Sequence, residues 1–266
     1  MTKFMHTITE SGAGAQLAIH GLRPAVGELA NCTISHARQY GFVLLRDLEL
    51  NREEFTAFVK SAGTTAEHRF GTGSAELLDL NADPDPKKYV TGRAPLPLHT
   101  DGAFVGTHPS FIILYCAHID QQPGDGETQL CDQRLAMASM PADLKELFSA
   151  PWEYMVHDAS HFPSIASQWV SVPPVIEKDD GTRTLNMAMP FELGDPNPGW
   201  SVRISGKSTE ESTALLRALD QYLKNSESFY SHRWRIGDLL ILDNSRVLHG
   251  RSAITGARHL YRGQLQ

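Results

Sequence analysis

The stretch LLILDNSRVLHGR, residues 239–251, decides the fold. Its first four residues are apolar and predict a buried strand, and the polar turn after them leads into a second strand. This second strand carries a histidine followed by a glycine, His249-Gly250. In a β-sandwich, strands that are distant in sequence face one another, so His249 can meet polar residues from much earlier in the chain.

Short β-type segments separated by turns fill most of the chain from residue 95 onward. They are predicted at residues 95–100, 110–116, 127–131, 152–156, 170–177, 182–191, 229–235, 239–242, 247–251 and 259–265. Residues 71–97 are rich in Gly, Pro, Asp and Lys, so we expect a long loop or lid there. Many short strands with this punctuation predict a mainly β fold with flanking helices, a double-stranded β-helix or jelly roll.

Helices are expected at three places around these strands. Residues 24–40 carry apolar side chains at roughly helical spacing. Asn51 and Glu54 form a capping box before a second helix, and Ser208 and Glu211 form another before a third. No internal repeat or linker divides the sequence, so we expect all 266 residues to form a single domain.

Composition and charge are those of an ordinary globular protein. The chain is 41% hydrophobic and 21% charged, with a net charge of −7 and an isoelectric point near 5.9. A chain of this length can fold without disulfides or a structural metal, which favours a functional role for any metal. The acidic balance argues against nucleic acid as a partner, and no apolar run approaches the ~18 residues that span a membrane.

The cysteines and the N-terminus indicate the compartment. Cys32, Cys116 and Cys131 are isolated and odd in number, which argues against a disulfide framework or a thiolate zinc site. The N-terminus is not followed by the apolar core of a signal peptide. We therefore expect a cytoplasmic protein, and the sequence leaves open whether it forms a homo-oligomer.

The segment Pro-Leu-His-Thr-Asp-Gly, residues 97–102, holds the most informative pair of polar side chains. Alternate side chains of an extended segment share a face, so His99 and Asp101 point the same way and can bind one metal ion. Two ligands do not make a site, and this spacing also arises by chance. With His249 as a third ligand they form a two-histidine, one-carboxylate set, which suits Fe(II) and leaves adjacent coordination positions open for catalysis.

Five motifs together resemble the Fe(II)/2-oxoglutarate-dependent dioxygenases of the taurine dioxygenase (TauD/TfdA-like) family, near its γ-butyrobetaine hydroxylase branch. Each motif is weak alone, but the five occur in the right order between Phe42 and the C-terminus. They are His99-x-Asp101, Gly124-Asp125-Gly126-Glu127-Thr128, Trp234-x-x-Gly237-Asp238-x-x-x-x-Asp243-Asn244, His249-Gly250-Arg251 and Arg258-His259-Leu260-Tyr261-Arg262.

The resemblance implies the cofactors and the residues that hold them. Fe(II), 2-oxoglutarate and O2 are expected, with succinate and CO2 released and the two histidines and the aspartate above as iron ligands and catalytic residues. Arg258 matches the basic residue that binds the C5 carboxylate of 2-oxoglutarate, and Thr128 matches a threonine that donates to it. A guanidinium suits this position because its planar fork pairs with a carboxylate and stays charged.

The resemblance also implies a small, anionic or amino-acid-like substrate. Arg262 matches the arginine that binds the substrate anion in the taurine branch, although it could equally assist with 2-oxoglutarate or form a surface ion pair. Phe104 is a candidate wall of the substrate pocket or plain core, and His68 is a candidate substrate contact. Hydroxylation is expected first, with desaturation or ring formation possible. Because related halogenases lack the carboxylate ligand, Asp101 argues against halogenation.

Two other readings of the whole sequence remain open. One is a metal-binding jelly roll that catalyses isomerisation, or binds a ligand, without consuming O2. The other is a noncatalytic, sugar-binding sandwich. Arg258 and Thr128 argue against the first, because a clamp for a cosubstrate carboxylate has no purpose in a simple binding module. The second would leave the convergence of His99, Asp101 and His249 as coincidence.

Three local patterns have simpler explanations. His157 and His161 have the spacing of a zinc helix, but Phe162-Pro163 would break such a helix. The glycines of residues 71–74 lack the Lys-Ser/Thr ending of a phosphate loop and indicate a lid. Gly102 and Gly250 follow expected metal ligands, and we expect both to relieve crowding there.

Overall fold

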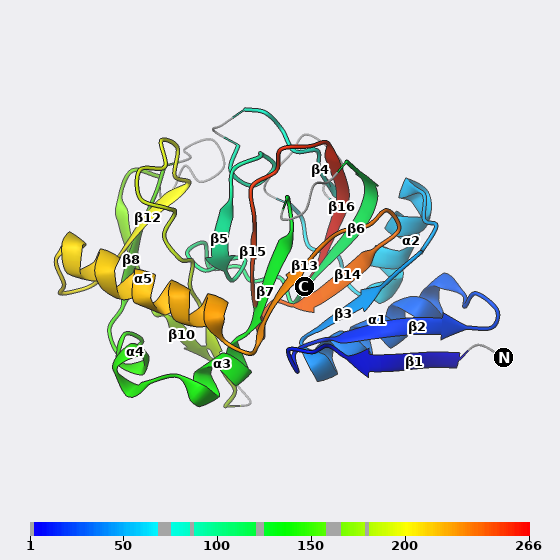
Figure 1. The fold of residues 1–266 in the computed structure, drawn as a ribbon, viewed down its shortest axis with the longest axis horizontal. Helices are drawn as coiled ribbons and strands as arrows, with labels where there is room; N and C mark the ends of the chain where they lie inside the picture. The colour runs from blue at the N-terminus through cyan, green and yellow to red at the C-terminus, as the bar shows by residue number, and fades with distance from the viewer. Residues whose placement is uncertain (1–2, 69–75, 86–87, 121–124, 158–165, 179–180) are drawn as a thin grey trace.

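The structure, a computed structural model, describes residues 3–68, 76–85, 88–120, 125–157, 166–178 and 181–266. Two β-sheets are stacked at its centre (Figure 1). The seven-stranded sheet has the order β1 (Lys3–Ile8), β2 (Ala15–His20), β3 (Phe42–Leu45), β14 (Leu239–Asp243), β6 (Phe111–Ile119), β16 (Arg258–Leu265) and β4 (Leu78–Leu80). The four-stranded sheet has the order β13 (Phe229–His232), β7 (Thr128–Asp132), β15 (Val247–Arg251) and β5 (Leu96–His99).

Alternating side chains on β14 show how the layers are built. Leu240 and Leu242 face the four-stranded sheet and pack in one buried cluster with Leu130 of β7. Leu239 and Ile241 point the opposite way, into a second buried cluster on the outer face of the seven-stranded sheet. Because successive side chains of a strand alternate and both faces are covered, every residue of this apolar run is buried.

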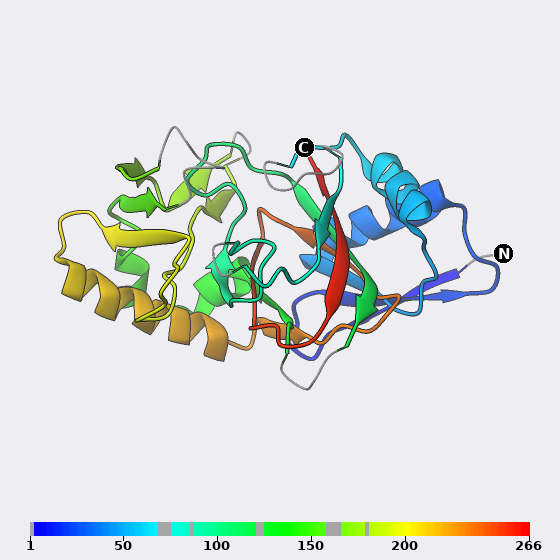
Figure 2. The same ribbon diagram turned by 90° about the horizontal axis from the view of Figure 1, so that it is seen from above.

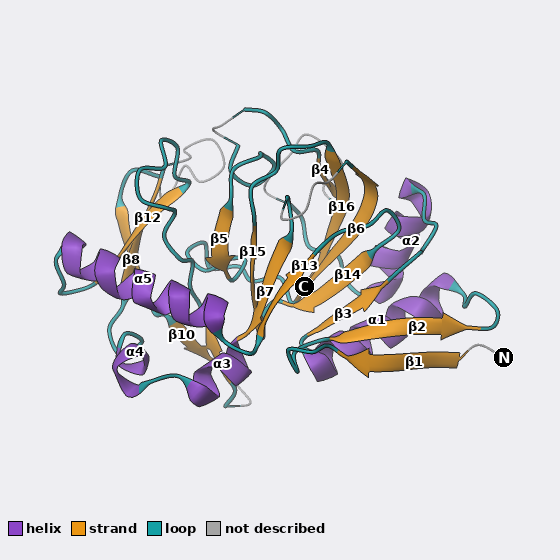
Figure 3. Cartoon of the chain, in the orientation of Figure 1, coloured by secondary structure: helices purple, strands orange, loops and turns teal. Residues whose placement is uncertain are grey.

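Two helices cover that outer face. Helix α1 (Val26–Tyr40) and helix α2 (Arg52–Ala62) pack on each other and on the seven-stranded sheet, as Figures 2 and 3 show. Asn51 and Glu54 form the predicted capping box at the start of α2. Gly41 ends α1 with a φ of 91°, a conformation that side-chain-bearing residues rarely adopt, and the chain passes directly into β3.

A second group of elements covers the outer face of the four-stranded sheet. Helix α5 (Thr209–Asn225) lies beside it in Figure 1, with the predicted Ser208–Glu211 capping box at its start. The other elements here are α3 (Gln133–Ser139), α4 (Ala142–Glu146), the sheet β12 (Trp200–Ile204), β8 (Trp152–Val156) and β9 (Trp169–Val172), and the pair β10 (Val175–Glu177) and β11 (Arg183–Leu185). Strand β12 brings Trp200 toward the interior, where it is buried.

The sequence predicted most elements and missed a few. Strands β8 and β15 have the expected bounds, but the β1–β2 hairpin, β12, α3 and α4 were not expected. Two prolines, Pro173 and Pro174, divide the strand expected at 170–177 into β9 and β10, and only 183–185 of the strand expected at 182–191 is a named strand. The loop expected at 71–97 contains the short edge strand β4.

No helix in the described ranges is both long enough and apolar enough to cross a membrane.

Arg246, in the turn between β14 and β15, connects three elements. Its Nε donates to Oδ2 of Asp132 at 2.7 Å, and its Nη1 donates to the carbonyl of Gln39 near the end of α1 at 2.7 Å. The Asp132 side chain is fully buried, and its other oxygen accepts from the backbone N–H of Arg134 at the start of α3. This ion pair therefore joins β7, α1 and the turn that precedes the strand of His249.

We expect Arg246→Met to lower the free energy of unfolding by about 3 kcal/mol, because it leaves the buried Asp132 carboxylate without its cation. The measurement is urea denaturation followed by circular dichroism. Arg203→Met is the matched control: its partner is Glu153, both side chains are partly exposed, and the loss should be below about 1 kcal/mol. Equal losses for the two variants would contradict the role given to Arg246.

Candidate active site

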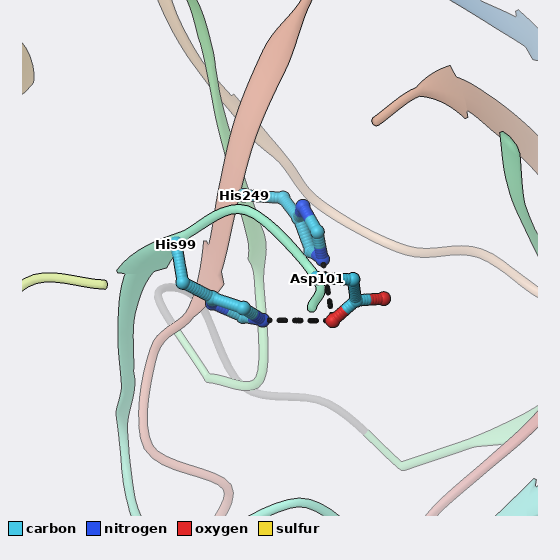
Figure 4. A group of neighbouring side chains, drawn as sticks. All are labelled: His99, Asp101 and His249. Carbon is cyan, nitrogen blue, oxygen red and sulfur yellow. Dashed lines mark ion pairs between the residues drawn. The ribbon is translucent and has the colours of Figure 1, made fainter. Parts of the chain in front are cut away.

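Three polar side chains meet where β5 and β15 run side by side. His99 ends β5 and pairs in register with His249 of β15, so the two imidazole centroids lie 4.3 Å apart. Asp101 follows two residues after His99, and its Oδ1 lies 3.3 Å from Nε2 of His99 and 3.6 Å from Nε2 of His249 (Figure 4). The structure thus brings together the three residues that the sequence predicted as metal ligands, with ligand atoms within 4.8 Å of one another.

Both histidines present a nitrogen suited to a metal. Nδ1 of His99 lies 2.8 Å from the carbonyl of Pro97 and donates to it, which leaves the Nε2 lone pair directed at Asp101. Both ring nitrogens of His249 are buried and have no hydrogen-bond partner in the part of the chain that the structure describes. Two imidazoles and one carboxylate are a donor set that fits Fe(II), so the residues present fit the expected metal.

The glycines beside these ligands have the predicted role. A Cβ on Gly250 would lie 2.7 Å from the carbonyl oxygen of Leu96, so a side chain there would push β5 away from β15. Gly102 has a φ of 91°, and a Cβ there would lie 2.1 Å from the carbonyl oxygen of Thr107. Glycine at position 250 therefore allows the close approach of β5 and β15 that sets His99 opposite His249, and glycine at position 102 allows the turn after Asp101 to approach Thr107.

Asn244, in the turn after β14, holds the backbone of Asp101. Its Oδ1 accepts from the backbone N–H of Asp101 at 2.9 Å, and its Nδ2 donates to the carbonyls of Asp101 at 3.1 Å and Pro109 at 2.8 Å. The side chain is buried, so water does not compete for these bonds. The sequence gave Asn244 no role of its own, although it lies in the Asp243-Asn244 motif that carried the family resemblance.

The charges around the triad favour the metal-binding protonation states. Burial raises the pKa of Asp101, but Arg262 and His249 oppose this and hold it well below its usual value. Burial, and then neighbouring His99, lower the pKa of His249. At neutral pH the carboxylate is therefore charged and His249 is neutral, which are the forms that bind metal.

Arg262 lies against the triad. On β16 it shares the interior face with Leu260, and its Nη2 forms an ion pair with Oδ2 of Asp101. The same Nη2 lies 3.4 Å from Oε1 of Gln264, while the Nε of Arg262 is buried without a partner among the described residues. The sequence predicted Arg262 as a substrate contact, and the structure places its guanidinium on a candidate metal ligand.

Thr128 and Arg258 are both buried close to the turn at Gly126. The indole N–H of Trp234 donates to Oγ1 of Thr128 at 2.9 Å, so the threonine keeps its own proton to donate elsewhere. Arg258 donates to the carbonyl of Gly126 at 2.8 Å, and its buried Nε has no partner within the described ranges. Burial, and then Arg251, lower the pKa of Arg258 to about 9. A carboxylate bound here would compensate this buried cation, so the pair fits the predicted cosubstrate subsite.

A cavity of about 790 Å³ opens beside the triad. Its lining includes His99, Asp101 and all three predicted substrate contacts, His68, Phe104 and Arg262. Two further aromatic residues complete one wall. They are Tyr89 and Trp200, which the sequence did not single out because no motif marks them.

The structure describes some of the remaining sequence patterns and not others. Arg251 donates to the backbone carbonyls of Tyr89, Val90 and Ala94 and so ties this loop to β15. His157 lies near Ser201, with its Nε2 2.9 Å from the hydroxyl. His161, the glycines of residues 71–74 and Gly124 lie outside the described residues.

The family of the chain follows from comparison with known proteins. The model of the family described as "Taurine catabolism dioxygenase TauD, TfdA family" matches residues 24–264. The chain belongs to the TauD/TfdA dioxygenase family. The predicted class, a non-haem Fe(II)/2-oxoglutarate-dependent dioxygenase, is therefore confirmed, and it leaves the isomerase and binding-module alternatives without support.

Two curated relatives of this TauD/TfdA member cover most of its length. The 3-((Z)-2-isocyanoethenyl)-1H-indole synthase of Fischerella ambigua is 26% identical, over 93% of this chain and 95% of the relative. The tyrosine isonitrile desaturase of Pseudomonas aeruginosa is 28% identical, over 89% of this chain and 81% of the relative. Neither is a γ-butyrobetaine hydroxylase, so placement near that branch has no support here.

A solved structure confirms the fold. The crystal structure of the PvcB protein from Pseudomonas aeruginosa matches with a TM-score of 0.74 and 23% identity, covering 100% of this chain and 91% of the other. Another structure of PvcB is described as "an Fe, alpha-ketoglutarate dependent oxygenase from an isonitrile synthetic pathway" and matches with a TM-score of 0.73 at 23% identity, over 100% of this chain and 92% of that one. The mainly β, jelly-roll prediction is confirmed, built from several sheets rather than one closed barrel.

We expect Asn244→Ala to weaken Fe(II) binding about tenfold, because the residue that fixes the backbone of a metal ligand is removed. Anaerobic Fe(II) titration of the apoprotein measures the effect. Asn225→Ala, at the exposed end of α5, is the control and should bind Fe(II) like the wild type. Unchanged affinity in Asn244→Ala would show that the loop holds Asp101 without this side chain.

Proposed function

We propose that this enzyme oxidises a small molecule that carries an aromatic group and an anionic group, and that the leading reaction is desaturation of an amino-acid-derived isonitrile. The observation that carries the proposal is the cavity beside the triad. The cavity has an aromatic wall next to His99 and a cationic side chain, Arg262, next to Asp101. A substrate with the two matching groups would place the bonds between them near the metal.

Trp200 is the centre of the aromatic wall. Its ring centroid lies 5.5 Å from that of Phe104, 5.8 Å from Tyr89 and 6.2 Å from His99. Phe191 packs behind it at 4.6 Å. Aromatic rings at these separations offer a flat, apolar surface on which a substrate ring can stack.

Arg262 and His68 form the polar end of the cavity. The Nε of Arg262 is a buried donor, suited to a carboxylate, and Nε2 of His68 is also buried without a partner in the described chain. The His68 ring hydrogen-bonds the backbone of Arg262, and burial, followed by the charge of Arg262, lowers the pKa of His68 to about 3. His68 is therefore neutral at neutral pH and offers a hydrogen-bond contact rather than a second charge.

The relatives support the same chemical class. The two that cover most of this chain are named for an isonitrile-bearing indole and a tyrosine isonitrile. A third, the 2,4-dichlorophenoxyacetate dioxygenase of Burkholderia sp., is 26% identical over 71% of this chain and 66% of its own length. All three names describe an aromatic compound, as the aromatic wall requires.

The proposed residue roles follow from the positions of the side chains. His99, Asp101 and His249 would hold iron, and Arg258 with Thr128 would hold the distal carboxylate of 2-oxoglutarate. Bound iron with 2-oxoglutarate and O2 supplies an oxidant that removes hydrogen from a C–H bond, with succinate and CO2 released. The protein's own contribution is to orient the substrate and to exclude water from the interior.

Several finer predictions remain part of this proposal. We propose that residues 1–266 work as one catalytic domain. Cytoplasmic location, lack of nucleic-acid binding and any homo-oligomer stay predictions from composition alone.

The first test is anaerobic titration of the apoprotein with Fe(II) and then 2-oxoglutarate. We expect the visible metal-to-ligand charge-transfer band of the chelate in the wild type and its loss in His249→Ala, because that variant lacks one iron ligand. A band that persists in His249→Ala would remove this residue from the triad. Bound iron without a band in the wild type would contradict the proposed use of 2-oxoglutarate.

The second test addresses the substrate class through succinate release. We expect turnover with the isonitrile derivatives of tyrosine or tryptophan and none with taurine. Trp200→Ala should raise the apparent KM for the aromatic substrate about tenfold, since its stacking surface is lost. Trp169→Ala, a partly exposed tryptophan outside the cavity, should leave KM unchanged. Taurine turnover, or equal KM values for the two variants, would contradict the proposed class.

A further inference from the structure

Arg262 contacts a candidate iron ligand directly, and we propose that it keeps Asp101 bound to iron through one oxygen only, which preserves the coordination position that O2 needs. Arg262 is thus a positioning residue that acts before any substrate arrives. This inference rests on the proposed function, because it assumes iron at the triad. The proposed role, control of how Asp101 binds iron, is separate from substrate binding by Arg262.

The two oxygens of the Asp101 carboxylate have different surroundings. Oδ1 faces the metal-binding nitrogens of His99 and His249, at 3.3 and 3.6 Å. Oδ2 is paired with Nη2 of Arg262, in a place where the two side chains are only 18% and 13% exposed. One oxygen is therefore available to a metal, and the other is held by a cation that water screens little.

The backbones of both residues in this ion pair are held by hydrogen bonds. Arg262 lies within β16, paired with Leu114 of β6 on one side and Leu78 of β4 on the other. Asn244 holds the backbone of Asp101 through hydrogen bonds to its N–H and its carbonyl. Because neither backbone can move freely, the ion pair determines how the carboxylate is rotated toward the metal.

Rotation of the carboxylate matters because the coordination positions are few. Two histidines and one carboxylate oxygen fill one face of an octahedral ion and leave the other three positions open. With 2-oxoglutarate bound as a chelate, two of these would be filled and one would be left for O2. A carboxylate can also bind a metal through both oxygens, and that mode would occupy the last position. Pairing of Oδ2 with Arg262 disfavours this mode.

Nitric oxide, which binds Fe(II) at the O2 position, tests the proposal without turnover. Wild type and Arg262→Met are loaded anaerobically with Fe(II) and saturating 2-oxoglutarate, without substrate, and titrated with nitric oxide while the electron paramagnetic resonance of the iron-nitrosyl complex is recorded. We expect both proteins to show the charge-transfer band, and Arg262→Met to bind nitric oxide about 10-fold more weakly or worse. Equal nitric oxide affinity would overturn the proposal.

Two further variants distinguish this role from non-specific disruption of the site. Arg258→Met removes another buried arginine from the same strand and should weaken 2-oxoglutarate binding, yet keep wild-type nitric oxide affinity once 2-oxoglutarate saturates. Arg262→Lys retains the charge and should recover part of the affinity, and it replaces Arg262→Met if that variant does not fold. A nitric oxide defect in Arg258→Met equal to that in Arg262→Met would overturn the proposal. If Arg262→Met does not fold, wild-type nitric oxide affinity in Arg262→Lys would overturn it. Loss of the charge-transfer band in the wild type would instead contradict the proposed function.

Discussion

The antiparallel pairing of β5 with β15 is the contact on which the rest of the site depends. It sets His99 opposite His249, although 149 positions separate them in the chain, and it is possible because Gly250 has no side chain to separate the strands. Asn244 then fixes Asp101 beside the two imidazoles. Each of these contacts joins the segment around residue 100 to the segment that contains β14 and β15.

The sequence predicted the parts of the fold and site that depend on local chemistry. Capping boxes at Asn51 and Ser208, the apolar run of β14 and the His-x-Asp spacing are short-range patterns, and each appears in the structure. The residues that were missed depend on tertiary contact. Trp200 comes to the cavity through β12, a strand that no sequence pattern predicted, and the edge strand β4 pairs with β16, which lies far away in the sequence. The roles of the site residues stay predictions until they are measured.

The arginines in the interior are satisfied by different partners. Two arginines near the site, Arg251 and Arg258, are buried in a protein of net charge −7, a third, Arg262, is mostly buried, and each is held differently. Arg251 donates to three backbone carbonyls, Arg258 to one, and Arg262 pairs with the carboxylate of Asp101. The more completely the protein itself satisfies an arginine, the less that arginine has left for a ligand. On this basis we expect Arg251 to be structural and Arg258 to be the most open to an incoming carboxylate. We expect Arg262 to divide its donors between Asp101 and a ligand.

The distance in sequence between the ligands also bears on how the protein folds. Residues 99–101 and 249 come together only after the intervening chain has closed a long loop, and loop closure of this kind costs conformational entropy before any contact compensates for it. A metal ion that binds only the folded state would therefore act as a crosslink between the two ends of that loop. Its binding energy would add to the stability of the whole sandwich, so apoprotein and metal-loaded protein should differ in unfolding as well as in chemistry.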